Sequence, residues 1–277
     1  MATASSARLA GKRVLVTGGG RGIGRAIALI CSREGAKVAI SSRTKEELEE
    51  TVKLAATGSQ QVCQTGKEEE STAPVMDSFV ADVTDSKSVE SMVKSIVERW
   101  GGIDILINNA GRGQARKGPL ETLDADELHN LLLLNVVSVQ IVTSCVLRQA
   151  MLPAQAGKII NISSRAGKMG LPQVSQYVTS KFALEGMTAS LAAELKDTNI
   201  QVNSLSPGMV NTQSFPKPEG RKGVRTAESV EDGLLALLLD DEITGRYLHV
   251  DELDTARDKG LNDRAAMKPI NEPTFDP

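Results

Sequence analysis

The chain has 277 residues and a mass of 29.5 kDa, which suits one large hydrophobic core near the upper size of a single α/β domain. Its net charge of −3 and its 3% aromatic content offer neither the positive field nor the stacking surface of a nucleic-acid-binding protein. The sequence shows neither an apolar run of about eighteen residues that would span a bilayer nor a secretory signal. We therefore expect a cytoplasmic protein with neither a membrane nor a nucleic-acid partner.

The cysteines and histidines indicate neither a redox motif nor a metal site. Cys31, Cys63 and Cys145 are far apart and form no Cys-x-x-Cys pair, so we expect reduced structural thiols. His129 and His249 have no partner at the spacing of metal ligands. With so few histidines, a Ser–His–Asp hydrolase is also poorly supported.

Short apolar runs typical of strands alternate with amphipathic helical stretches along the whole chain. In chain order the predicted elements are a strand at 13–18, a helix at 23–35, a strand at 37–42, a helix at 45–56, a strand at 77–83, a helix at 86–101, a strand at 103–111, a helix at 124–150, a strand at 157–164, a helix at 175–196, a strand at 200–208, a helix at 229–240 and a strand at 245–250. Fully apolar strands between helices indicate a parallel sheet covered on both faces. We therefore predict a Rossmann-type α/β fold over residues 1–251, a doubly wound parallel sheet in three α/β/α layers and a single domain.

Two stretches depart from this alternation. Residues 57–76 are polar and rich in Gly, Ser and Thr where a short helix-to-strand loop would suffice, which predicts a surface insertion. Residues 252–277 carry several charges and two late prolines, so we expect them to form a C-terminal tail and not to belong to the core.

A glycine-rich turn follows the first predicted strand. In "TGGGRGIG", Gly18, Gly22 and Gly24 have the spacing Gly-x-x-x-Gly-x-Gly, and Gly20 and Ile23 lie between them. Glycine allows a tight turn and the close approach of a diphosphate, to which the following helix presents free N–H groups. The turn predicts a dinucleotide cofactor.

The end of the second strand indicates which dinucleotide is bound. An acidic residue there would hold the ribose 2′-hydroxyl of NAD, but this chain has Ser42 and Arg43 in "ISSRT". A guanidinium can pair with a 2′-phosphate, and Arg21 in the glycine turn could assist. These residues favour NADP(H); the alternative is that both arginines are ordinary surface residues.

One of only two tyrosines lies four residues before a lysine in "SQYVTSKFAL". Tyr177 and Lys181 share one helix face at this spacing, and a nearby ammonium would favour the phenolate over the phenol. Ser163 and Ser164 end a strand just before this helix, at the sheet edge where ligands bind in such folds. A hydroxyl there could donate a hydrogen bond to a substrate carbonyl.

Five motifs in order, "TGGGRGIG", "NNAG" at 108–111, the serine thirteen residues before the tyrosine, "YVTSK" and "SPGMVNT" at 206–212, resemble the short-chain dehydrogenase/reductase family. The resemblance covers about residues 10–251 and is to the compact single-domain, 3-oxoacyl reductase-like branch. It implies that Ser164 polarises the carbonyl and that Tyr177 is the general acid in reduction. It also implies that Lys181 lowers the pKa of the tyrosine and binds the nicotinamide ribose. Asn135 would position a water behind that lysine; the alternative is a capping or core amide.

The resemblance implies further cofactor contacts besides Tyr177 and Lys181. They are Asp82 and Val83 at the adenine, Asn108, Ala110 and Gly111 under the adenosine ribose, and Pro207, Gly208, Val210 and Thr212 at the nicotinamide carboxamide. For Asp82 the alternative is a place in the N-terminal turn of the following helix, since "DVTDSKS" also fits the chemistry of a helix cap.

The sequence departs from the family pattern in two places. The usual closing Val-Asp-Gly-Gly is "VDEL" at 250–253, which puts the last turn and its subunit contacts in doubt. The substrate lid expected at 213–228 is short, which suggests an open pocket or a compact substrate. The four cations of the lid could attract an anionic substrate or form a solvated charge run: Lys217, Arg221, Lys222 and Arg225.

The sequence thus predicts an NADPH-dependent reductase of a ketone or aldehyde, a small-molecule carbonyl/alcohol substrate, and a homodimer or homotetramer formed through the helices at 124–150 and 175–196. The main alternative is a catalytically idle NADP-binding sensor or scaffold on the same fold. A dehydratase or epimerase of the longer branch is disfavoured by the glycine spacing and the lack of a large second domain. A 3-oxoacyl thioester, a sugar, a steroid-like ketone and a small diketone all remain open as substrates.

Overall fold

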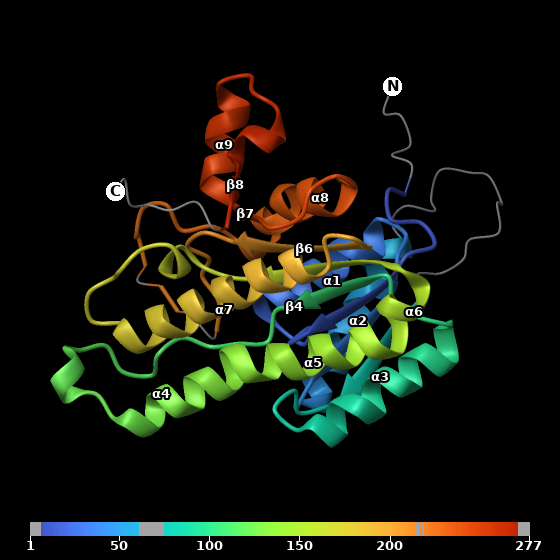
Figure 1. Cartoon of the computed structure of the whole chain (residues 1–277), viewed down its shortest axis with the longest axis horizontal. Coiled ribbons are helices and arrows are strands. Elements are labelled where there is room, and N and C mark those ends of the chain that lie inside the picture. The colour runs from blue at the N-terminus through green and yellow to red at the C-terminus, as the bar shows by residue number, and fades with distance from the viewer. Residues whose placement is uncertain (1–6, 61–74, 214–215, 218, 271–277) are drawn as a thin grey trace.

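The computed structural model describes residues 7–60, 75–213, 216–217 and 219–270 (Figure 1). In them eight strands form one sheet in the order β3-β2-β1-β4-β5-β6-β7-β8, parallel except for the antiparallel β7–β8 pair. The strands are β1 Arg13–Thr17, β2 Lys37–Ser42, β3 Met76–Val80, β4 Ile105–Asn108, β5 Ala156–Ile162, β6 Asn199–Ser206, β7 Arg246–His249 and β8 Met267–Pro269. The seven parallel strands begin and end within three residues of their predicted bounds.

Helices cover both faces of this sheet (Figure 1). They are α1 Gly22–Arg33, α2 Lys45–Gln60, α3 Ser86–Trp100, α4 Ala125–Leu132, α5 Ser138–Val146, α6 Leu152–Ala154, α7 Ser175–Glu194, α8 Glu231–Leu239 and α9 Val250–Asp258. Alternate side chains of a strand point to opposite faces, so Val14 and Val16 join the core under α1 and α8, while Leu15 joins the core under α3 and α5. The predicted doubly wound, three-layer α/β/α fold is confirmed.

The helix predicted at 124–150 runs without a break from Ala125 to Ala154 and contains two π-helical segments, Leu133–Val137 and Leu147–Met151. The helix has 30 residues, and its most apolar window has a mean hydropathy of 1.9, so it is long and apolar enough to cross a membrane, although the sequence suggested no such stretch. Half of its most apolar window is buried inside the protein, as expected of a core helix. The first π-helical segment contains Asn135, and such segments occur often at functional sites.

The C-terminal segment is not the tail that its charges predict. Residues 250–258 form α9, and β8 pairs antiparallel with β7 and covers what would otherwise be an exposed edge strand. Leu253, Ala256 and Met267 are buried in the core, while the charged residues between them face outward. The domain therefore extends to residue 270, and residues 271–277 lie outside the described residues.

The two other predicted irregular segments are described only in part. α2 continues through residues 57–60 and β3 begins at Met76, so most of the predicted 57–76 insertion lies at 61–74, outside the described residues. In the predicted lid at 213–228, residues 214–215 and 218 also lie outside them. Its later part returns to the sheet edge, where Arg225 forms a parallel bridge with Val210.

Candidate active site

The predicted site residues gather at the carboxyl ends of the central strands. The glycine turn follows β1, the "NNAG" segment follows β4, Ser164 follows β5, and Pro207 follows β6. The strand order reverses between β1 and β4, and ligands of doubly wound folds bind at this position.

The glycine turn is shaped for close approach of a ligand. Gly18 and Gly22 have φ of +66° and +54°, in the region that favours glycine. A Cβ at Gly24 would lie 2.1 Å from the carbonyl oxygen of Gly18 and 2.4 Å from Nδ2 of Asn109, so a side chain there cannot be accommodated. Among the described residues, Arg21 holds the N-cap position of α1, and its side chain accepts no hydrogen bond from the first N–H groups of the helix. The first turn of α1 contains no acidic residue. This helix end can therefore receive an anion.

A cleft runs from this turn across the ends of β2, β3 and β4. It is lined by thirteen of the predicted cofactor residues: Gly18, Gly20, Arg21, Gly22, Ile23, Gly24, Ser42, Arg43, Asp82, Val83, Ala110, Gly111 and Thr212. It is also lined by six residues that were not predicted: Ser41, Thr44, Glu47, Ala81, Asn109 and Leu134. The predicted residues Asn108, Pro207, Gly208, Val210, Tyr177 and Lys181 are not among its lining.

Both arginines expected at a 2′-phosphate line the cleft. One guanidinium nitrogen of Arg21 lies 3.1 Å from Glu47 Oε1 and 3.1 Å from the side-chain oxygen of Gln213. Thr51 Oγ1 lies 3.0–3.2 Å from the carbonyl oxygens of Gly19, Gly20 and Glu47, to any of which it can donate, and so ties α2 to the glycine turn. The carboxylate of Glu47 therefore pairs with the guanidinium of Arg21, which is the group that would bind a 2′-phosphate.

Asp82 lines the cleft but also orders its own turn. Its Oδ1 accepts hydrogen bonds from the backbone N–H of Thr84 (2.9 Å) and from its hydroxyl (2.7 Å), and these bonds lower the pKa of Asp82. The cap of α3 is Asp85, which accepts from the N–H of Lys87 at 3.0 Å. Asp82 therefore belongs to the turn that leads into α3, as the alternative expected, and it also lines the cleft.

The structure brings Ser164, Tyr177 and Lys181 together beside β5. Ser164 makes a side-chain hydrogen bond with Tyr177, and the ammonium of Lys181 lies 5.9 Å from the centroid of the tyrosine ring. Lys181 Nζ also donates to the carbonyl oxygen of Ile162 at 2.9 Å. Ser163, the other candidate, is buried, and its hydroxyl has no hydrogen-bond partner among the described residues. Ser164 is thus the serine that meets the tyrosine.

Burial dominates the electrostatics of this group. It raises the pKa of Tyr177, and the hydrogen bond with Ser164 opposes this only in part. It also lowers the pKa of Lys181 from 10.5 to about 8, while the buried carboxylate of Glu185 acts the other way. The shift at Tyr177 is opposite to the one expected from the lysine, because burial removes water from the charged phenolate and this is the largest effect on its pKa.

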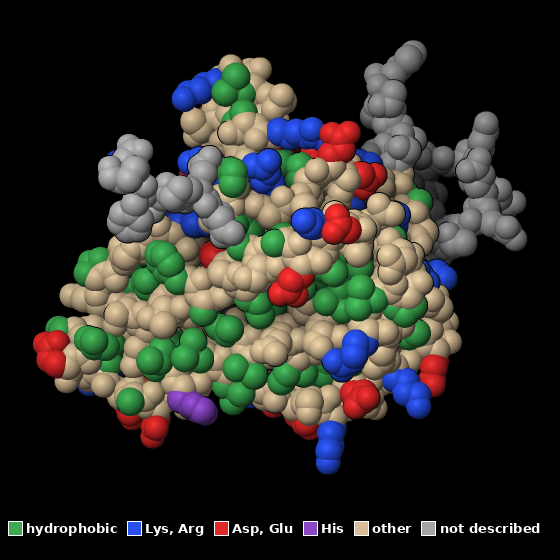
Figure 2. Space-filling view, viewed as in Figure 1, with side chains coloured by type: hydrophobic (Ala, Val, Ile, Leu, Met, Phe, Trp, Pro, Cys, Tyr) green, Lys and Arg blue, Asp and Glu red, His purple; other side chains and the backbone are tan. Residues whose placement is uncertain are grey.

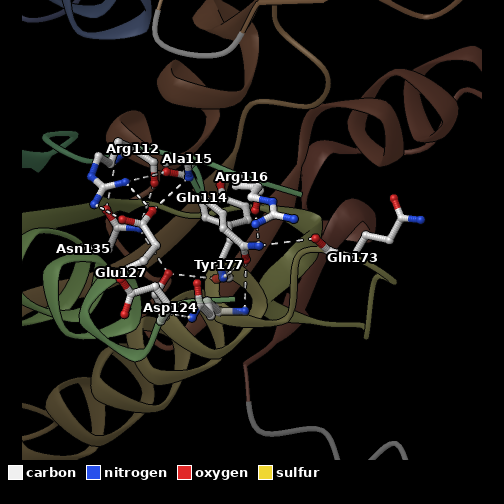
Figure 3. Close-up of polar contacts among 12 residues, drawn as sticks. Arg112, Gln114, Ala115, Arg116, Asp124, Glu127, Asn135, Gln173 and Tyr177 are labelled. Atoms are coloured by element: carbon white, nitrogen blue, oxygen red, sulfur yellow. Dashed lines mark hydrogen bonds and ion pairs between the residues drawn. The ribbon is translucent and has the colours of Figure 1, made fainter. Parts of the chain in front are cut away.

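Asn135 is held by the backbone of the loop after β4 (Figure 3). Its Oδ1 accepts from the N–H of Arg112 at 3.0 Å, and its Nδ2 donates to the carbonyl oxygen of Arg112 at 2.9 Å and to Ser180 Oγ at 3.1 Å. The side chain of Arg112 forms a two-point ion pair with Glu127 on α4 at 2.6 and 2.8 Å. The asparagine therefore joins its π-helical segment to this loop and to α7, and Arg112 links the loop to α4.

A family model described as short chain dehydrogenase matches residues 12–220, more than half of the chain. The chain belongs to the short-chain dehydrogenase/reductase family. The 3-oxoacyl-acyl-carrier-protein reductase FabG of Thermotoga maritima is 32% identical over 259 residues, which cover 88% of this chain and 98% of that protein.

Two solved structures of similar proteins contain a nicotinamide cofactor. A variant of actinorhodin polyketide ketoreductase with NADPH matches with a TM-score of 0.73 and 29% identity, covering 90% of this chain and 97% of that one. A xylitol dehydrogenase with NAD⁺ bound matches with a TM-score of 0.73 and 30% identity, covering 87% and 98%. This short-chain dehydrogenase/reductase is therefore an oxidoreductase that acts on CH–OH or C=O groups with a nicotinamide cofactor.

The turn after β6 in this short-chain dehydrogenase/reductase is tied to α9. Gly208 has φ of +73°, and a Cβ there would lie 3.0 Å from Val250 Cγ2. Arg225 returns beside this turn and pairs with Asp251 (2.8 Å) and with Asp254. The chain at "VDEL" thus begins α9, and two carboxylates of this helix hold Arg225 of the predicted lid.

Of the two asparagines in "NNAG", the sequence predicted Asn108 at the cofactor and missed Asn109, which lines the cleft. Asn108 is buried, and its amide donates to Thr143 Oγ1 and Asn161 Oδ1, both at 2.9 Å, beneath the cleft. Its neighbour Asn109 lines the cleft and donates to the carbonyl oxygens of Thr17 and Gly18. The alternation of side chains along β4 is the signal that could have separated the two asparagines.

Proposed function

We propose that this short-chain dehydrogenase/reductase is an NADPH-dependent reductase of a ketone or aldehyde. The observation that carries the proposal is the contact of Ser164, Tyr177 and Lys181 beside a cleft that begins at a glycine turn. The glycine turn, the uncapped start of α1 and the two arginines fit a phosphorylated dinucleotide. The cofactor supplies a hydride when it is bound.

The residues around the tyrosine supply the proton and the orientation. Because burial raises the pKa of Tyr177, its hydroxyl stays protonated at neutral pH and is suited to act as the acid. The hydroxyl of Ser164 donates to the carbonyl oxygen of the substrate and polarises it. The ammonium of Lys181 stabilises the phenolate that remains once the proton has left.

The selectivity for NADPH is assigned to Arg21 and Arg43. Both line the end of the cleft next to Ser42, and a guanidinium binds phosphate with paired hydrogen bonds. Other members of the predicted set are assigned supporting roles: Asn135 in the proton relay, Asp82 and Val83 at the adenine, and Pro207, Gly208, Val210 and Thr212 at the carboxamide.

We further propose that the protein acts in the cytoplasm as a homodimer or homotetramer. Figure 2 shows hydrophobic side chains spread over the outer surface of α4, α5 and α7. Val137 and Phe182, on the two long helices, are 40% and 47% exposed although they are large and apolar. Apolar faces on two neighbouring helices suit a symmetric interface.

The test is oxidation of NADPH by the purified protein with a panel of carbonyl compounds. A 3-oxoacyl thioester comes first, because relatives are named as reductases of oxoacyl and polyketide substrates, followed by a diketone, a sugar and a steroid ketone. We expect turnover with at least one compound and a kcat/KM at least tenfold lower with NADH. Tight NADPH binding without turnover on any compound would instead support the sensor or scaffold.

A further inference from the structure

The helix that carries Tyr177 and Lys181 begins at a residue that cannot cap it. The first four N–H groups of a helix have no partner within the helix and are usually satisfied by a Ser, Thr, Asp or Asn at the preceding position. Val174 holds that position in α7, and its side chain has no oxygen to offer. The N–H groups of Gln176 and Tyr177 therefore need an acceptor from elsewhere.

Gln114, in the loop after β4, supplies that acceptor (Figure 3). Its Oε1 accepts hydrogen bonds from the N–H of Gln176 at 3.1 Å and from the N–H of Tyr177 at 3.3 Å. Its Nε2 donates to the carbonyl oxygens of Arg116 at 2.6 Å and Gln173 at 3.3 Å. The two donated bonds fix the plane of the amide, so its oxygen is directed at the start of the helix.

The same loop supports the chain that leads into α7. Gln173 is in the left-handed region with φ of +67°, which is unfavourable for a residue with a Cβ. Its carbonyl oxygen accepts from the N–H of Gly118 at 3.0 Å as well as from Gln114. The side chain of Gln176 in turn donates to the carbonyl oxygen of Asp124 at 2.7 Å. Several bonds from residues 114–124 thus set the entry of the chain into the helix.

We propose that Gln114 is a positioning residue: its amide oxygen caps α7 from a distant loop and thereby fixes the hydroxyl of Tyr177 against Ser164. The inference rests on the proposed function, in which Tyr177 donates the proton. Tyr177 is the third residue of α7 and lies in the turn that loses its order without a cap. Lys181 lies one turn further and is held independently by Ile162. Loss of Gln114 therefore displaces the acid and leaves the ammonium in place.

The test compares three variants with the wild type. Gln114→Leu removes the cap at similar size, and Gln114→Leu/Val174→Asp restores a cap from the helix's own first position. Gln201→Leu is the matched control. Gln201 lies near the amino end of β6, opposite the carboxyl ends that form the cleft, and its Oε1 has no hydrogen-bond partner among the described residues. The readouts are kcat, KM for the best carbonyl compound, the Kd of NADPH, and hydrogen exchange of the backbone amides at 175–178.

We expect kcat of Gln114→Leu to fall roughly 10- to 100-fold, the loss that a displacement of about 1 Å produces in a reacting group. The Kd of NADPH and the KM should stay within about twofold of the wild type, and exchange at 175–178 should become faster. The double variant should regain most of the kcat and the slow exchange. Gln201→Leu should match the wild type in every readout.

Three results would overturn the inference. They are an unchanged kcat in Gln114→Leu, a loss that appears only in KM, and a loss of kcat that the local cap at position 174 does not restore. The last two would make Gln114 a substrate contact. If the wild type shows no turnover at all, the proposed function fails, and the exchange of the amides still decides whether Gln114 caps the helix.

Discussion

Replacing Lys181 by Met should abolish activity and at the same time stabilise the protein. The side chain of Lys181 is almost fully buried, at 7% exposure, and its ammonium donates to the carbonyl oxygen of Ile162 at 2.9 Å. Burial lowers its pKa from 10.5 to about 8. At 1.36 kcal/mol per pKa unit, keeping this ammonium charged costs about 3 kcal/mol of folding free energy at pH 7.

The net gain on substitution is smaller than this cost. Met has a similar volume and no charge, but it leaves the carbonyl oxygen of Ile162 without its donor, which costs about 1 kcal/mol. We therefore expect Lys181→Met to raise the free energy of unfolding by about 2 kcal/mol at pH 7, and Tm by roughly 5 °C for a chain of this size.

The sign of the pH dependence follows from the lowered pKa. The unfolded chain binds the lysine proton up to about pH 10.5 and the folded chain only up to about pH 8. The cost of burying the lysine is therefore fully present below pH 8, declines as the pH rises from 8 to 10.5, and is absent above that. The advantage of the Met variant should shrink over the same interval.

Urea unfolding of the cofactor-free proteins at pH 7 and pH 10 measures this difference. The control is Lys53→Met on the exposed face of α2, which should change the free energy of unfolding by no more than about 0.5 kcal/mol at either pH. The reasoning is refuted if Lys181→Met is less stable than the wild type at pH 7, or if its advantage is as large at pH 10.

Two further changes test the cleft. Gly24→Ala places a methyl 2.1 Å from the carbonyl oxygen of Gly18, so the turn must open. Titration of the protein's fluorescence should then show that NADPH binds at least tenfold more weakly. A Kd within twofold of the wild type would contradict the role assigned to this turn. Glu47→Gln removes the carboxylate that pairs with Arg21, so the Kd of NADPH should fall several-fold while that of NADH, which lacks the 2′-phosphate, stays the same. Equal changes for both cofactors would show that Glu47 does not act on the phosphate.

The parallel sheet could be predicted because its strands are buried on both faces and therefore appear as continuous apolar runs. Val14, Leu15 and Val16 are all fully buried, with neighbouring side chains in different halves of the core. The glycine turn was equally visible, since only glycine permits the approach of Gly24 to Gly18. Both signals are local in the sequence, so an isolated segment suffices to recognise them.

The features that were missed depend on contacts between distant segments. β8 is only three residues long and contains a lysine and a proline, so nothing in it indicates a strand until β7 is beside it. Gln114 lies 62 residues before the N–H that it caps. Glu47 lies in the first turn of a charged helix and resembles its exposed neighbours until the glycine turn packs against it. Pairings of this kind become visible only in the folded chain.

The most direct test of the proposed reduction is the comparison of wild type with Tyr177→Phe, using NADPH and the best carbonyl compound of the panel. The variant keeps the ring and loses only the hydroxyl that meets Ser164. We predict that kcat falls at least about 100-fold, the usual contribution of a general acid, while the Kd of NADPH stays within about twofold. Turnover that survives in Tyr177→Phe would contradict the assignment of the proton to this tyrosine.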